Sequence, residues 1–321
     1  MRWWLKAGVA RCLAWLPAGE AIHFWLQRRF GELRHLEQST RFDNAEYFLR
    51  TTRAHAGYVH GLRVVELGTG WVPAVPLAYA VAGALVATYD VRRLVRDDLF
   101  ARTRDEIGRR AEKLAAAAGQ SPARFCARLA RIAKETQFDR ALRRLGGLYR
   151  APWNTCRLPY KDNAVDLVVS NLVLQCVHRA LLPPLLEEMR RVLKPGGLSI
   201  HRASLTCEYA AGDPRRHPLS YLKYSDATWN RWFNHSIKYV NRLRYSQFLQ
   251  LFEEAGFEIA EVRPAVDYDA IPHLKELGVA DEFRGFSWED LATTGFEIVL
   301  KKPAAVPSST AYLQPVAVNA D

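Results

Sequence analysis

The sequence predicts a doubly wound α/β fold with a mostly parallel sheet, and three patterns along the chain indicate it. First, a β-branched run ends in an acidic residue and two glycines one residue apart, within Val64 to Gly70. Second, apolar strands alternate with amphipathic helices, which is the order typical of a parallel sheet. Third, polar residues follow the strand ends, at the edge where open α/β sheets bind ligands.

The stretch from Val64 to Trp71 is predicted to be the first strand and the sharp turn after it. Gly68 and Gly70 permit backbone angles that other residues avoid, so the chain can turn tightly beneath a ligand. A second buried strand, 84–89, leads directly into Asp90. Asp90 lies 20 residues beyond Gly70, the spacing at which an acidic residue meets a ribose in dinucleotide-binding units. The two strand ends therefore predict a site for a nucleotide-like ligand.

The remaining elements follow from apolar periodicity. Residues 72–83 form a helix only if Pro73 and Pro76 fall in its first turn. A helix at 181–192, with Leu181 on its buried side, is expected to end at the glycine pair of Lys194-Pro195-Gly196-Gly197. Further strands are expected at 167–171, 198–201, 257–262 and 296–301, and a further helix at 246–255.

Two long regions interrupt this alternation. Residues 91–150 are helical in pattern and too long for one crossover, so they predict a helical insert or lid. They carry 16 Lys or Arg against 7 Asp or Glu. Solvated helix faces explain this excess most simply, and contact with an anionic acceptor is the alternative. Residues 203–245 are polar and aromatic, and they lie where acceptor-binding loops belong.

The first 60 residues form an N-terminal helical extension. Leu5, Val9, Leu13 and Leu16 make one apolar stripe, with tryptophans and basic residues beside it, and a second amphipathic helix begins near Glu20. Such helices either pack on the adjoining domain or lie in a bilayer interface. A membrane surface contacted by residues 1–35 is therefore one of two alternatives.

Composition indicates a globular protein, with 49% apolar and 25% charged residues. No apolar run reaches the roughly 20 residues of a membrane span, and Arg11 interrupts the run that resembles a secretory signal. The five cysteines are scattered and lack paired spacing, which predicts free thiols, a reducing compartment and no structural metal. We expect a cytoplasmic protein, peripheral on the inner membrane face if its N-terminal helices bind lipid.

The motifs VVELGTGW, ATYD, LPYKDNAVDLVVSN, LLEEMRRVLKPGG and FEEAGFEI occur in this order. Together they resemble the class I S-adenosylmethionine-dependent methyltransferases, over about Gly61 to Lys301. Dehydrogenases also carry a G-x-G turn, but LPYKDNAVDLVVSN followed by RVLKPGG is not typical of them. A weaker likeness, carried by Leu16 to Glu20, ELGTGWVPAVPL and Tyr239 to Arg244, is to methyltransferase-domain proteins of bacterial glycan and related biosynthetic clusters.

This resemblance implies a seven-stranded, Rossmann-like methyltransferase fold that binds S-adenosyl-L-methionine. The expected divisions are an N-terminal extension at 1–60, a methyltransferase domain at 61–302 and a disordered tail at 303–321. Within the domain, the helical insert spans about 91–150 and the acceptor-side region about 203–245.

The resemblance also implies a cofactor site formed by these residues: Glu66, Gly68, Thr69, Gly70, Asp90, Asn154, Thr155, Ser170 and Asn171. In that family the glycine turn holds the methionine part and Asp90 would accept hydrogen bonds from the ribose. Asn154 stands where an acidic residue usually faces the adenine amine, and its amide oxygen can still accept that hydrogen bond. Ser170 and Asn171 would line the methyl-transfer side. Val72 occupies the position of a usual third glycine.

A hydroxyl acceptor is a poor nucleophile at neutral pH and needs a base within hydrogen-bond reach. His201, at the predicted C-terminal end of a strand, is the first candidate, and His178, after the fourth strand, is the second. For both, a surface or core-packing role is the alternative. Glu208, Tyr209 and His235 are further candidates in the polar region.

The leading functional hypothesis is O-methylation of a small-molecule, glycan or lipid-linked acceptor. A nucleic-acid methyltransferase is the second, prompted by a pI of about 9.5, although Asn171 to Leu174 lacks the Pro-Pro-aromatic motif of base-amine methylases. A non-catalytic methyltransferase-like scaffold is the third. Asn241, Arg242 and Arg244 either fix an anionic group of the acceptor or bridge their loop to the sheet edge.

Overall fold

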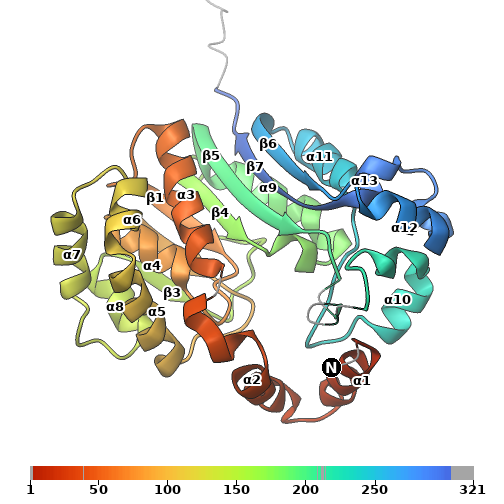
Figure 1. The fold of residues 1–321 in the computed structure, drawn as a ribbon. Coiled ribbons are helices and arrows are strands. Elements are labelled where there is room, and N and C mark those ends of the chain that lie inside the picture. Colours follow the sequence, from red (N-terminus) through yellow and green to blue (C-terminus); the bar gives the residue numbers. More distant parts are fainter. Residues whose placement is uncertain (1–2, 39, 208, 211–212, 214, 305–321) are drawn as a thin grey trace, which may run out of the picture.

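A computed structural model describes residues 3–304, except 39, 208, 211–212 and 214, and shows one seven-stranded sheet with helices on both faces (Figure 1). The strand order is β3-β2-β1-β4-β5-β7-β6. Neighbouring strands pair in parallel except at β7, which is antiparallel to both β5 and β6. The predicted doubly wound, mostly parallel fold is confirmed.

The strands are β1 (Arg63–Leu67), β2 (Leu85–Tyr89), β3 (Leu148–Arg150), β4 (Val165–Asn171), β5 (Leu193–Ser204), β6 (Glu258–Val266) and β7 (Thr293–Lys301). The N-terminal half of the chain supplies the helices α1 (Trp3–Ala14), α2 (Gly19–Phe30), α3 (Arg41–Ala56), α4 (Ala74–Val81), α5 (Asp97–Arg109), α6 (Ala111–Ala117), α7 (Pro122–Ala130) and α8 (Phe138–Arg144). The C-terminal half supplies α9 (Leu182–Val192), α10 (Asp226–Trp232), α11 (Tyr245–Glu254), α12 (Ala270–Leu277) and α13 (Trp288–Ala292).

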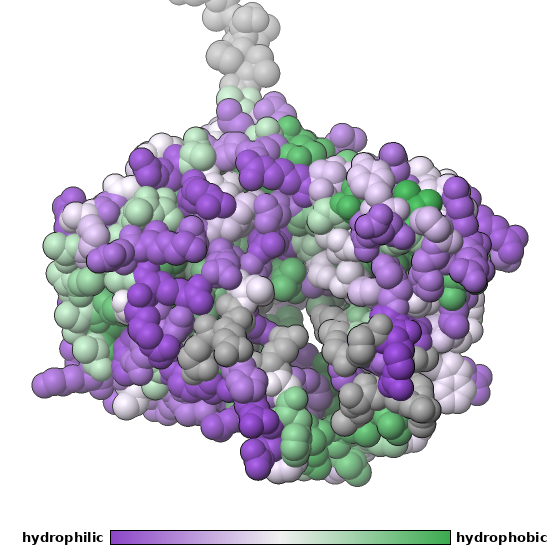
Figure 2. Space-filling model, in the orientation of Figure 1, coloured by the Kyte–Doolittle hydropathy of each residue, from purple (hydrophilic) through white to green (hydrophobic). Residues whose placement is uncertain are grey.

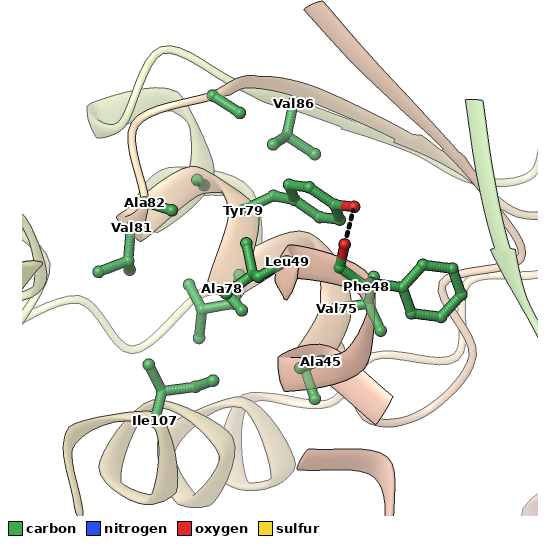
Figure 3. Packing of buried hydrophobic residues seen from close by; sticks show 14 of the residues in the cluster. Ala45, Phe48, Leu49, Val75, Ala78, Tyr79, Val81, Ala82, Val86 and Ile107 are labelled. Atoms are coloured by element: carbon green, nitrogen blue, oxygen red, sulfur yellow. Dashed lines mark hydrogen bonds between the residues drawn. The ribbon is translucent and has the colours of Figure 1, made fainter. Parts of the chain in front are cut away.

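One face of the sheet is covered by α3 and α4, with the helices of the insert packed behind them. Tyr79 of α4 is fully buried, and its hydroxyl donates to the Phe48 carbonyl of α3 over 3.1 Å (Figure 3). Ile107 of α5 and Phe125 of α7 belong to the same apolar cluster. The insert is therefore part of the core on this face, because its apolar stripes are buried against α3 and α4.

The opposite face is covered by α9 and α11. Leu185 and Met189 of α9, with Phe252 of α11, are buried against strand residues such as Val168. The prediction that Leu181 belongs to this buried face is wrong, since its side chain is 51% exposed. Leu181 lies in the 3-10 turn Arg179–Leu181 that precedes α9, so the helical repeat that buries Leu185 does not extend to it.

Two further boundaries differ from the sequence prediction. The Lys194 to Gly197 stretch does not cap α9, which ends at Val192; it lies within β5, where Gly196 adopts a φ of +75° near a register shift against β4. The short strand β3 lies inside the range assigned to the helical insert. The condition on α4 is met, because Pro73 precedes the helix and Pro76 lies in its first turn.

Within residues 3–304, no helix combines the length and apolarity needed to cross a bilayer. The N-terminal extension consists of α1, α2, a 3-10 segment (Glu32–Gln38) and α3, and both α3 and the 3-10 segment contribute buried side chains to the cluster on the sheet. Most of the predicted disordered tail, residues 305–321, lies outside the described residues, as does Glu208.

Candidate active site

The carboxyl ends of β1, β2 and β4 align at one edge of the sheet. Leu67 of β1 is in register with Tyr89 of β2 on one side and with Ser170 of β4 on the other. The loops that follow these strands therefore meet at that edge, which is where parallel sheets bind ligands.

The glycine turn after β1 packs against the protein on one side and is open on the other. Gly68 has a φ of +77°, and its amide donates to the Tyr89 carbonyl over 2.7 Å. A Cβ at this position would lie 2.4 Å from Cγ2 of Val173, in the loop after β4. Gly70 has a φ of +65°, and a Cβ there would meet nothing within 4 Å. The turn thus rests on the β4 loop and leaves space on its other side.

Asp90 lies at the centre of the edge and is 6% exposed. Its Oδ2 accepts from the Gly70 amide over 2.8 Å, and its Oδ1 accepts from the Arg92 amide over 3.0 Å. Burial raises the pKa of Asp90, while these backbone donors oppose the rise. The Asp90 carbonyl accepts from the Trp153 amide over 2.8 Å. This last bond fixes the loop after β3, which carries Asn154, beside Asp90.

The predicted adenine-side residues lie in that loop. Asn154 is exposed, and its Oδ1 accepts from the Cys156 amide over 3.0 Å, while Thr155 is partly exposed beside it. The structure therefore brings together three of the predicted groups: the glycine turn, Asp90 and the Asn154 loop. A buried acceptor, an open turn and an exposed amide fit a ligand that carries a diol and an aminopurine.

Glu66 holds the base of the turn. Its carboxyl group is buried and accepts from Thr88 Oγ1 over 2.5 Å, and Thr69 Oγ1 lies 2.5 Å from the same hydroxyl. Burial raises the pKa of Glu66 well above its usual range, and the nearby Asp90 charge adds to the rise. Thr88 was not predicted, because a threonine inside an apolar strand gives no signal of its own.

We predict that Gly68→Ala destabilises the protein by about 1.5 kcal/mol, because alanine disfavours a positive φ by roughly 1 kcal/mol and its Cβ would clash with Val173. Urea unfolding measures the change. The double variant Gly68→Ala/Val173→Ala removes the clash, so its loss of stability should be smaller than the sum of the losses in the two single variants. In Gly70→Ala the new Cβ meets open space, so only the positive φ should lower the free energy of unfolding. An equal loss of stability in Gly68→Ala and Gly70→Ala would contradict the clash.

Two predicted site residues, Ser170 and His201, point away from this edge. Both are fully buried, and Ser170 Oγ lies 2.7 Å from His201 Nδ1. Nε2 of His201 lies 2.7 Å from Ser199 Oγ, and the ring stacks on Phe252 of α11 at 6.2 Å between centroids. Because strand side chains alternate between faces, Ser170 and His201 enter the layer beneath α11.

The assignments of these two residues are therefore corrected. His201 cannot reach an acceptor, because both its ring nitrogens are engaged by serine hydroxyls and its ring is buried. Burial lowers the pKa of His201 to about 3, so the imidazole is neutral and acts in packing. Ser170 likewise does not line the methyl-transfer side.

Asn171 and Leu172 end β4 on the open side. Asn171 Oδ1 accepts from Asn44 Nδ2 of α3 over 3.1 Å, and Asn44 Oδ1 accepts from the Arg202 guanidinium. Leu172 has a φ of +59° and is 42% exposed, although a branched apolar residue rarely adopts this conformation. Its amide donates to the Arg202 carbonyl and its carbonyl accepts from Gln175 Nε2. A strained backbone conformation that is fixed by hydrogen bonds in this way is typical of functional loops.

Among the remaining base candidates, His178 is accessible. It is exposed, its Nδ1 accepts from the Ala180 amide over 3.3 Å, and its ring stacks on Tyr239. Tyr209 is 3% exposed, with its hydroxyl 2.9 Å from His235 Nε2. Burial and the Lys238 charge lower the pKa of His235 to about 4. These two form an internal pair.

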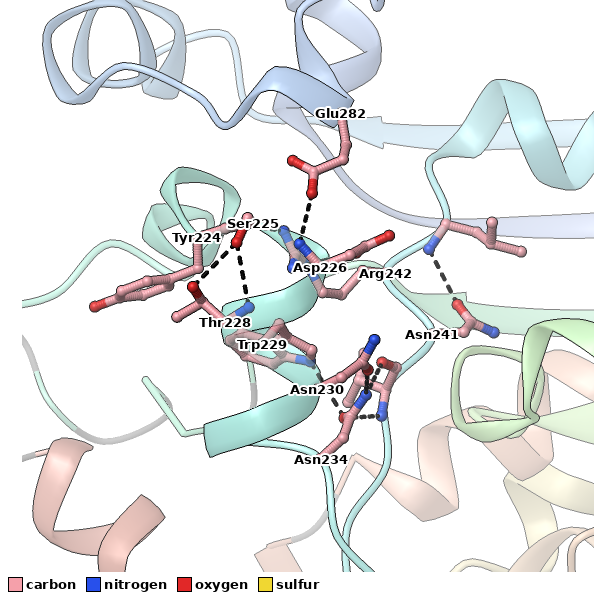
Figure 4. A network of polar contacts seen from close by, with 12 residues as sticks. Tyr224, Ser225, Asp226, Thr228, Trp229, Asn230, Asn234, Asn241, Arg242 and Glu282 are labelled. Carbon is pink, nitrogen blue, oxygen red and sulfur yellow. Dashed lines mark hydrogen bonds and ion pairs between the residues drawn. The ribbon is translucent and has the colours of Figure 1, made fainter.

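Arg242 is enclosed instead of facing a ligand. Its side chain is 2% exposed, with its guanidinium 4.7 Å from the Phe283 ring centre and 5.2 Å from that of Trp229. One nitrogen lies 3.3 Å from Asp226 (Figure 4). Burial lowers the pKa of Arg242, and Asp226 opposes that shift.

Asn241 and Arg244 tie the same segment to its surroundings. Asn241 Nδ2 donates to the Leu174 and Val177 carbonyls, so it connects its own segment to the loop after β4. Arg244 is fully buried, and one of its nitrogens donates to three carbonyls before and at the start of β7, those of Asp290, Leu291 and Thr293. Of the two alternatives for these residues, the structure favours bridging over acceptor binding.

The N-terminal helices cover the remaining side of the site. Trp71, which follows the glycine turn, contacts the rings of His23 and Phe24 of α2 at 5.6 and 5.7 Å between centroids. Nη1 of Arg92 donates to Glu20 Oε1 over 2.9 Å and to the Ser236 carbonyl over 3.4 Å. Arg92 therefore joins Asp90, α2 and the acceptor-side region. Sequence reasoning missed it because the partners of its side chain, Glu20 and Ser236, are distant in the chain.

Comparison with known proteins adds a family. Residues 151–201, from the Asn154 loop through β4 and α9 into β5, match the family described as a methyltransferase domain. No sequence among curated proteins matches significantly. The order β3-β2-β1-β4-β5-β7-β6 with an antiparallel β7, the site at its carboxyl edge and this match over residues 151–201 support the predicted methyltransferase with S-adenosylmethionine as its cofactor.

Among solved structures, the chain is similar to an S-adenosylmethionine-dependent methyltransferase from Mesorhizobium loti (17% identity, TM-score 0.43, covering 80% of this chain and 97% of that one). It is also similar to one from Methanosarcina mazei (17% identity, TM-score 0.41, covering 76% of this chain and 94% of that one). A third is phosphoethanolamine N-methyltransferase 2 from Haemonchus contortus (15% identity, TM-score 0.45, covering 87% of this chain and 59% of that one).

Proposed function

We propose that the protein methylates a hydroxyl group of a small-molecule, glycan or lipid-linked acceptor in the cytoplasm. The observation that carries this proposal is an open glycine turn next to Val173 of the loop after β4, a loop that also carries an accessible histidine. Gly70 leaves space above the turn, Leu172 presents an exposed side chain, and His178 is exposed within the same loop. The loop thus offers an apolar wall and a base.

The cofactor supplies an electrophilic methyl group on a sulfonium. Asp90 is placed to accept hydrogen bonds from a diol, since its carboxylate already accepts two amide donors at the open edge. Trp71 and α2 exclude water from one side of the site. His178 takes the hydroxyl proton at Nδ1, whose present contact, with the Ala180 amide, is long.

The basic helical insert does not support the alternative of a nucleic-acid acceptor. Several of its cations are paired with carboxylates, which reduces the charge available to a polyanion. The pairs within 4 Å are Arg93 with Asp139, Arg104 with Asp105, Arg109 and Arg110 with Glu106, Lys113 with Glu46 and Arg144 with Glu135. Solvated and ion-paired helix faces are therefore the simpler explanation of this region.

We predict that His178→Gln lowers kcat at least tenfold and leaves the affinity for S-adenosylmethionine unchanged. A general base typically contributes about 100-fold or more, and an exposed base contributes less. Transfer of a radiolabelled methyl group to a panel of sugar, phenol and lipid alcohols measures the rate, and calorimetry measures cofactor binding.

The pH profile separates a base from a structural residue. For the wild type, kcat/KM should rise with pH as the catalytic base loses its proton, and the variant should lose that dependence. His60→Gln, which changes another exposed histidine, is the matched control. An unchanged profile in His178→Gln would remove the base assignment. Absence of cofactor binding by the folded wild type at millimolar concentration would remove the enzyme proposal.

A further inference from the structure

The N-terminal helices leave a bare apolar face. Among the residues that the structure describes, fifteen large apolar side chains are exposed, and nearly half of them fall within residues 5–30. These are Leu5, Val9, Trp15, Leu16, Ile22, Trp25 and Phe30, with exposed fractions from 39% to 80%. Patches of this kind on a protein surface mark interaction sites.

The opposite face of the same helices is already occupied. Ala7 and Ala10 of α1 are buried in a cluster with Tyr209 and Phe233 of the acceptor-side region. In α2, Phe24 contacts Trp71, as described above. Because α1 is apolar on both faces and only one face packs on the protein, the other face requires a different partner.

The charge around the bare face is positive. Residues 1–36 contain six Lys or Arg against two Asp or Glu; Glu20 pairs with Arg92, and Arg28 pairs with Asp98. The guanidinium of Arg29 lies 5.8 Å from the Phe30 ring centre, beside Trp25. Exposed tryptophans with arginines beside them are what the headgroup region of a bilayer favours, and anionic lipids add electrostatic attraction.

The bare face also lies beside the acceptor side of the site. In Figure 2 hydrophobic atoms gather along the lower margin, over α1 and the adjoining end of α2. The inner faces of these two helices contact the acceptor-side region and Trp71, which follows the glycine turn. A surface that contacts the lower margin would therefore lie beside the acceptor side.

We propose that the outer face of α1 and α2 docks on an anionic lipid bilayer, and that the acceptor hydroxyl belongs to a lipid-linked molecule that enters from that bilayer. This proposal rests on the proposed methyltransferase function for the acceptor, whereas the docking itself does not. Trp15 and Trp25 insert at the interface, and Arg29 faces the lipid phosphates.

Vesicle flotation tests the docking with the full-length protein. We expect the wild type to float with vesicles containing 30% phosphatidylglycerol, less with pure phosphatidylcholine, and less in high salt. Trp15→Ser/Trp25→Ser should reduce the bound fraction at least tenfold. Trp288→Ser, which changes a 37% exposed tryptophan on α13, should leave flotation unchanged.

Three outcomes would overturn the proposal. The wild type could stay unbound to anionic vesicles while still binding S-adenosylmethionine in calorimetry, which would remove the docking and leave the enzyme intact. Sedimentation could show a dimer that the double variant abolishes without vesicle binding, which would assign the face to a second copy. Radiolabelled methyl groups could appear only in water-soluble products when a total lipid extract is the acceptor source. Vesicle binding without cofactor binding would instead contradict the proposed function alone.

Discussion

Replacing Asp90 by alanine is expected to weaken the binding of S-adenosylmethionine about 100-fold. The carboxylate lies at the meeting point of the glycine turn and the Asn154 loop, where it is placed to accept two hydrogen bonds from a ribose. A hydrogen bond to a charged group contributes roughly 1.5 kcal/mol or more, so losing two costs about 3 kcal/mol, or two factors of ten in affinity. Isothermal titration calorimetry with the purified protein measures the change.

Two further variants show whether the loss comes from the carboxylate. Asp90→Asn keeps the volume and one acceptor oxygen, so we expect an intermediate loss of affinity. Asp98→Ala removes a carboxylate that pairs with Arg28 at the surface, and its affinity should equal that of the wild type. Thermal unfolding controls for the amide bonds that Asp90 makes with Gly70 and Arg92. Wild-type affinity in Asp90→Ala would exclude Asp90 from the cofactor site.

Much of the fold could be predicted because local patterns specify it. The prolines at 73 and 76 permit a helix only with both near its start, and α4 begins accordingly at Ala74. The elements that were missed depend on contacts with distant residues. β3 has three residues, too few to show a period, and it forms because Leu148 to Arg150 pair with β2. The Gly196 region continues β5 because Lys302 pairs with it on the other side.

The site shows the same division between local and distant information. The position of Asp90 follows from its spacing to the glycine turn, which a single βαβ unit determines. The orientation of His201 depends on which face of β5 meets α11, about fifty residues later in the chain. Arg92 and Asn44 join the site through partners more than seventy residues away. None of these contacts leaves a pattern in the local sequence.

Acidification should lower the stability of the protein because His201 is buried in its neutral form. In the folded protein burial lowers the pKa of His201 to about 3, whereas an unfolded histidine titrates near 6.5. Between these values the unfolded chain binds more protons, so the free energy of unfolding falls as the pH falls below 6.5. The slope approaches about 1.4 kcal/mol per pH unit, which amounts to about 2 kcal/mol between pH 6.5 and 4.5.

The measurement is a comparison of urea unfolding at these two pH values for the wild type and His201→Gln. Glutamine keeps a donor and an acceptor for the Ser170 and Ser199 hydroxyls but does not titrate, so its loss of stability should be smaller by about 2 kcal/mol. His235, whose pKa is also lowered, contributes equally to both proteins and cancels. Equal slopes in the wild type and His201→Gln would mean that His201 titrates normally, and the general-base assignment would then reopen.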